Sequence, residues 1–221
     1  MRTHSSKCLI RSGLAASVLL LASSASFAQV PVVNLTAKPT QAVLPDGESV
    51  PMWGYTCGAV TQGTVPGTSC AAVNRNAGTN WSPVVITVPY SESAPGVSTT
   101  SLTIRLANNL SFGATPNNID TSIVIDGQLG GGLGTPGSFT PSPDHSSAQT
   151  VTWPAADPIT KGSPPKQGPR VKSFATEVAA IPAATSPQTP TSLSWNRLKP
   201  GTYLIHSGTH PSIQHPMGLY G

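Results

Sequence analysis

The closing stretch of the chain, "HSGTHPSIQHPMGLYG" (206–221), gathers the side chains best able to bind a metal ion. His206, His210 and His215 offer imidazole nitrogens, and Met217 offers a thioether sulfur. Both donor types suit copper, but a blue-copper site also needs a thiolate, and no cysteine lies near these residues. Two interpretations stay open: a looser copper site made by these four residues, or a surface loop whose histidines bind no metal.

The first 28 residues have the pattern of a leader. Arg2, Lys7 and Arg11 precede an apolar run, and the small residues Ser26 and Ala28 follow it. This order predicts a secretory signal peptide cleaved after Ala28, because the apolar run is too short to span a bilayer. We therefore expect a periplasmic or secreted protein with no membrane attachment after cleavage.

Removal of that leader changes the charge of the chain. Three of the 12 Lys and Arg residues leave with it, so nine remain against eight Asp and Glu, a net charge of about +1. No basic cluster is left, which argues against nucleic acid as a partner.

Two cysteines follow the leader, Cys57 and Cys70. A pair of thiolate metal ligands would need further Cys or His residues nearby in the sequence, and there are none. In the oxidising environment of an exported protein we expect a Cys57–Cys70 disulfide, which would stabilise the fold by about 3 kcal/mol.

The composition favours short strands over helices. Charged residues make up only 9% of the chain, and it contains 21 Gly and 23 Pro. No window has a helical period, whereas several alternate apolar and polar residues as half-buried strands do. We expect one all-β domain over 29–221, an antiparallel sandwich with Greek-key connections. The expected strands are 31–38, 50–56, 83–89, 99–109, 121–126, 170–178, 192–196 and 201–206.

Two segments interrupt this pattern. Residues 58–80 are rich in turn signals and hold one of the two cysteines. Residues 127–169 form a long Gly/Pro-rich stretch of a length unusual inside a compact domain, and we expect a poorly ordered insertion there. Its glycine cluster lacks the Lys-Ser/Thr of a phosphate-binding loop.

Several strings, in this order, resemble the N-terminal cupredoxin (plastocyanin-like) domain of multicopper oxidases. They are "LPDGESVPMWGY" (44–55), "SLTIRLANNL" (101–110) with "TSIVIDGQ" (121–128), and "LKPGTYLIHSGTH…MGLYG" (198–221). The resemblance implies a cupredoxin-like Greek-key sandwich and an oxidoreductase function in the complete protein. Such enzymes oxidise substrates at a mononuclear copper and reduce oxygen at a trinuclear copper cluster.

The resemblance also implies four cluster ligands from this domain, as two His-x-His pairs. Residues two apart on a strand project to the same face, so each pair can serve adjacent copper ions. In this chain the first pair falls on Val124 and Asp126, and the second on His206 and Gly208. Valine cannot ligate, and carboxylate is a poor substitute for imidazole on copper that cycles to the +1 state. We therefore expect no trinuclear cluster here, with only His206 matching the motif.

The family's domain continues beyond "MGLYG" into a final strand and then into further domains. We expect this chain to lack that strand and to be a fragment of a longer protein, whose other cupredoxin domains would be its partners. Three hypotheses follow. The chain is part of an exported multicopper-oxidase-like protein and inactive alone, or it sequesters copper ions with its closing His/Met cluster, or it is a metal-free structural domain.

Overall fold

The computed structural model describes residues 30–59, 61, 65–111, 119–134, 137–142, 168–180 and 189–221. The expected signal peptide and residues 143–167 of the expected insertion lie outside this part of the chain. Within it, strands dominate, and α3 (Pro211–Gln214) is a single helical turn. The prediction of an all-β chain is confirmed. No helix in the described residues is long and apolar enough to cross a membrane.

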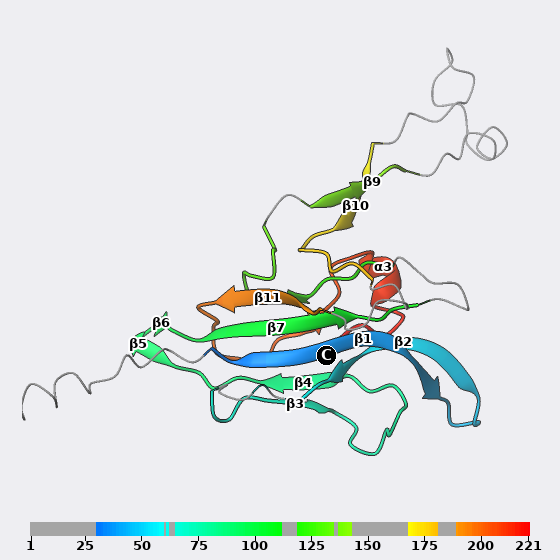
Figure 1. Ribbon diagram of the computed structural model, residues 1–221, viewed down its shortest axis with the longest axis horizontal. Coiled ribbons are helices and arrows are strands. Elements are labelled where there is room, and N and C mark those ends of the chain that lie inside the picture. Colours follow the sequence, from blue (N-terminus) through cyan, green and yellow to red (C-terminus); the bar gives the residue numbers. More distant parts are fainter. Residues whose placement is uncertain are drawn as a thin grey trace, which may run out of the picture.

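The largest sheet has four strands in the order β11-β7-β1-β2 (Figure 1). β1 pairs antiparallel with β2 and parallel with β7, and β11 pairs antiparallel with β7. The bounds are β1 (Val32–Val43), β2 (Ser49–Cys57), β7 (Ser101–Asn108) and β11 (Thr191–Asn196).

Alternation along these strands determines which face of the sheet is buried. In β7, Leu102, Ile104 and Leu106 are buried while Arg105 is exposed, the alternation expected of a half-buried strand over 99–109. β1 buries Val33, Leu35 and Ala37 in the same way, because residues two apart on a strand share a face. Trp195 of β11 is fully buried in the core that these residues build.

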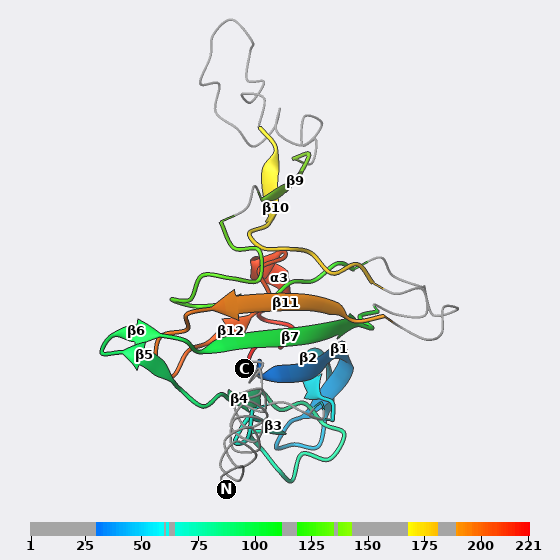
Figure 2. The same ribbon diagram turned by 60° about the vertical axis from the view of Figure 1, so that its left-hand side comes forward.

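The other strands form two-stranded pairs around this sheet. Figures 1 and 2 show the β9–β10 pair standing away from the rest of the described chain, with the β3–β4 pair beside β1 and β2. The pairs are β3 (Ser69–Ala72) with β4 (Val84–Thr87), β5 (Glu92–Ala94) with β6 (Val97–Ser98), β8 (Val124–Ile125) with β12 (Ile205–His206), and β9 (Ser138–Thr140) with β10 (Arg170–Ser173).

The expected disulfide is present. It joins Cys57, at the end of β2, to Cys70 in β3, with their Cα atoms 5.6 Å apart. The bond therefore ties the β3–β4 pair to the main sheet. Disulfides persist in proteins outside the reducing cytoplasm.

The start of the expected insertion packs against the core. Gly131 N–H donates to the carbonyl of Ser194 at 2.9 Å. A Cβ atom on Gly130 would lie 2.3 Å from Trp195 Cδ1, and one on Gly131 would lie 2.4 Å from Trp195 Cζ2. Only glycine allows the backbone to approach the indole so closely. The glycine cluster thus covers the buried tryptophan.

Candidate functional site

The four positions at which the resemblance implies copper ligands converge in the structure. β8 and β12 pair antiparallel, with Val124 opposite His206. Asp126 directly follows β8, and Gly208 lies two residues beyond His206. Residues some 80 positions apart in the chain therefore meet at one place, where they form two contacts of different kinds.

The first contact is apolar packing between Val124 and Gly208, both of which are buried. A Cβ atom on Gly208 would lie 2.7 Å from Val124 Cγ2 and 3.1 Å from Ser122 Oγ. Real Cβ atoms do not approach a carbon to 2.7 Å, so only glycine fits at position 208 beside the Val124 side chain. The structure offers no space for an imidazole at position 208 while Val124 keeps this position.

The second contact is polar. The Nε2 atom of His206 lies 2.9 Å from Oδ1 of Asp126, and its Nδ1 lies 2.9 Å from the carbonyl oxygen of Ser207. The histidine side chain is 15% exposed and the aspartate 56%. Both ring nitrogens of His206 therefore lie within hydrogen-bond distance of a protein oxygen. A metal ion at this histidine would have to displace one of these oxygens.

The remaining candidates of the closing stretch have separate roles. His215 lies at the end of α3, and its Nε2 is 2.6 Å from the Ser207 carbonyl oxygen. Its ring meets that of His206 edge to face, with centroids 4.1 Å apart. His210 precedes α3 in the left-handed region, with φ of 41°, and its N–H donates to the Lys172 carbonyl. Met217 packs against the hydrophobic core.

The closing stretch offered four candidate copper ligands, His206, His210, His215 and Met217. The structure brings the rings of two of them together, those of His206 and His215. Among the described residues, no three His, Cys, Asp or Glu side chains lie close enough together to hold a metal ion. A Ser-His-Asp arrangement is not formed by the histidine pair either, because His206 contacts Ser207 through the carbonyl oxygen. The Ser207 hydroxyl bonds to Gln214 instead, at 2.5 Å.

Beneath the two contacts lies a buried hydroxyl network that the sequence analysis missed. Its members are at most 1% exposed, and they are Thr121, Ser122, Ser173, Ser207, Thr209 and Gln214. Such groups cost free energy when buried unless they find hydrogen-bond partners. The sequence does hold a signal for this network, because hydroxyl residues accompany both ligand motifs. They are Thr121 and Ser122 at the first motif, and Ser207 and Thr209 at the second.

The network has two centres. Gln214 Oε1 accepts from the Thr121 hydroxyl at 2.8 Å and from Ser207, while its Nε2 donates to the Asp120 carbonyl at 2.8 Å. Thr209 Oγ1 lies 3.0 Å from Ser122 Oγ and 3.1 Å from Ser173 Oγ. Each centre joins segments distant in the chain, so the network holds the β8 and β12 strands in one arrangement.

Charges beside the network are paired. Lys172 Nζ lies 2.5 Å from Asp120 and 3.3 Å from Glu177. The hydrogen bond to Asp120 raises the pKa of Lys172, which keeps the amine charged. Tyr55, whose hydroxyl donates to the Ser122 carbonyl at 3.3 Å, is fully enclosed, and burial raises its pKa. Neither group is poised to exchange protons near neutral pH.

Comparisons of this chain with protein-family models, with curated proteins and with solved structures find no match.

Proposed function

We propose that this chain is the N-terminal, cupredoxin-like Greek-key domain of an exported multicopper-oxidase-like protein, and that it serves as a structural domain which holds no catalytic copper. The oxidoreductase activity, where present, belongs to the complete protein. This proposal rests on the resemblance of the sequence motifs, and the geometry of the β8–β12 pair supports it.

The observation that carries the proposal is the convergence of Val124, Asp126, His206 and Gly208. A domain descended from a copper site would bring these four positions together, and the pairing of β8 with β12 does so here. The residues present do not fit a trinuclear cluster. Val124 fills the space beside Gly208, and the Asp126 carboxylate is hydrogen-bonded to the Nε2 atom of His206. Valine has no donor atom for copper.

A second candidate function is copper sequestration, favoured by the contact between the His206 and His215 rings. The two imidazoles supply nitrogen donors of the kind that Cu²⁺ binds. This arrangement would hold about one ion, and only after the hydrogen bonds to Ser207 and Asp126 had opened.

One experiment separates these functions. The chain is produced in copper-supplemented medium, exported and purified, and its copper content and its oxidation of a phenolic substrate are measured. A structural domain holds no more copper than the His206→Ala, His215→Ala double variant and does not oxidise the phenol. One copper ion per chain that the double variant loses would support sequestration. Three ions, or phenol oxidation, would refute the proposal.

A further inference from the structure

The sequence contains two Asp-Gly pairs, Asp46-Gly47 and Asp126-Gly127. In such a pair the backbone nitrogen of the glycine can attack the side-chain carboxyl carbon of the aspartate, because glycine has no Cβ atom to obstruct the approach. All four residues are exposed, so water reaches both pairs. Residue type and exposure do not distinguish the two pairs, but their hydrogen bonds do.

The first pair is held by two hydrogen bonds. The N–H of Gly47 donates to the Leu44 carbonyl at 2.9 Å, so the attacking nitrogen is already engaged in the turn. The Asp46 carboxylate accepts from the Glu48 N–H at 3.0 Å. Both bonds have to break before the Gly47 nitrogen and the Asp46 carboxyl carbon can meet.

The second pair has a free attacking nitrogen. The N–H of Gly127 has no hydrogen-bond partner among the described residues. The Asp126 side chain is 56% exposed, and its carboxylate is held by one contact, at 2.9 Å from Nε2 of His206. One hydrogen bond fewer therefore opposes the attack at this pair. A difference of one hydrogen bond corresponds to a rate difference of about fivefold.

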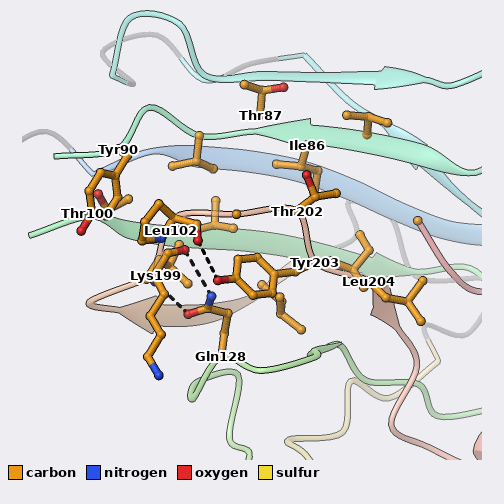
Figure 3. Close-up of a pocket in the computed structure, with 18 of the residues that line it drawn as sticks. Ile86, Thr87, Tyr90, Thr100, Leu102, Gln128, Lys199, Thr202, Tyr203 and Leu204 are labelled. Carbon is orange, nitrogen blue, oxygen red and sulfur yellow. Dashed lines mark hydrogen bonds between the residues drawn. The ribbon is translucent and has the colours of Figure 1, made fainter. Parts of the chain in front are cut away.

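The chain is anchored on both sides of the second pair. On one side the Asp126 N–H donates to the Leu204 carbonyl at 2.9 Å. On the other side lies Gln128, which lines the pocket drawn in Figure 3. Its side chain accepts from the Lys199 N–H at 3.0 Å and donates to the Lys199 carbonyl at 3.3 Å. A backbone held at both ends has no slack for an added atom.

We propose that Asp126 is a site of spontaneous conversion to isoaspartate, and that this conversion releases His206 from its carboxylate. In the first step the Gly127 nitrogen bonds to Cγ of Asp126, a carboxyl C–O bond breaks, and one water molecule leaves with the amide proton. In the second step water adds to the former main-chain carbonyl carbon and breaks its bond to the Gly127 nitrogen. The water taken up balances the water released, and nothing is oxidised or reduced.

The product changes the contact with His206. The main chain now runs through the former side-chain methylene, so it is one atom longer between the anchors at Leu204 and Gln128. The carboxylate is attached directly to Cα and reaches one atom less far. It therefore leaves Nε2 of His206, which it contacts at 2.9 Å before conversion. This inference does not depend on whether the chain binds copper.

The test ages the folded chain at neutral pH and digests it with endoproteinase Asp-N, which cleaves before aspartate but not before isoaspartate. Conversion of Asp126 leaves residues 120–143 as one peptide, and conversion of Asp46 leaves the chain uncut at that position. We expect conversion at Asp126 to be about fivefold faster than at Asp46. In the urea-unfolded chain the two rates should become similar, because neither pair keeps its hydrogen bonds.

The variants Asp126→Asn and Asp46→Asn test the ring closure itself, because the same attack then releases ammonia and leaves a new negative charge. The folded Asp126→Asn variant should gain this charge faster than the folded Asp46→Asn variant. Equal rates at the two positions of the folded chain, or a faster reaction at position 46, would overturn the proposal. So would NMR signals of the His206 ring that are the same in the converted and the fresh chain.

Discussion

Gly208→Ala is expected to destabilise the chain through one contact. The position is buried, and its backbone does not adopt a positive φ, so the cost comes from the added methyl group. That methyl would lie 2.7 Å from Val124 Cγ2. Overpacking of this kind costs about 2 kcal/mol of unfolding free energy. Gly168→Ala is the matched control, because a Cβ atom there meets nothing within 4 Å.

A double-mutant cycle isolates that contact. Val124→Ala removes buried apolar groups and should cost about 2 kcal/mol by itself. If the two positions were independent, the double variant would lose about 4 kcal/mol. The shorter side chain at 124 makes room for the methyl at 208, so we expect a loss nearer 2 kcal/mol and a coupling of about 2 kcal/mol.

Urea unfolding, followed by tryptophan fluorescence with the disulfide intact, measures these free energies. Trp195 is fully buried and should report loss of the core. Losses that add to within about 0.5 kcal/mol would refute the argument that Val124 and Gly208 replace two ligands by packing. A Gly208→Ala variant as stable as the Gly168→Ala control would refute it as well.

Three further predictions concern other parts of the fold. Reduction of Cys57–Cys70 should lower the unfolding free energy by about 3 kcal/mol, measured by urea unfolding with and without reductant, and an unchanged midpoint would contradict this. Gln214→Ala should cost about 3 kcal/mol because it removes three buried hydrogen bonds, those with the Thr121 hydroxyl, the Ser207 hydroxyl and the Asp120 carbonyl. Ile213→Ala, at a residue 55% exposed, should cost under about 0.5 kcal/mol. Burial raises the folded-state pKa of Tyr55 above its unfolded value of 10.0, so the unfolding free energy should fall as the pH rises above 10. The Tyr55→Phe variant should show a smaller fall, measured by urea unfolding at several pH values. The same pH profile in both proteins would contradict this prediction.

Local patterns in the sequence were enough to predict the main strands. Alternation in residues 99–109 and 31–38 predicted β7 and β1. These strands follow their patterns because one face of the sheet lies on the core and the other does not. The run 121–126 was predicted as one strand, but only Val124–Ile125 form β8. Thr121 and Ser122 enter the hydroxyl network, a tertiary interaction that alternation does not reveal.

The closing stretch shows where local patterns fail. A helical turn of four residues is too short for any period, so α3 was not predicted, although Pro211 at its start is a typical first residue. The bond between His206 and Asp126 joins residues 80 positions apart and depends on the β8–β12 pairing. The absence of histidine at 124 and 208 was visible in the sequence. The sequence did not show that the Val124 side chain occupies the space that a side chain at position 208 would need.

The central claim, that packing occupies the implied copper positions, is tested most directly by titrating Cu²⁺ into the folded chain while recording NMR spectra. We expect the Val124 methyl signals to stay sharp in excess Cu²⁺ and to keep their cross-peaks to the Gly208 α-protons. Loss of the Val124 and Gly208 signals at one equivalent of Cu²⁺, with the rest of the spectrum unchanged, would place a paramagnetic ion between them and contradict the claim.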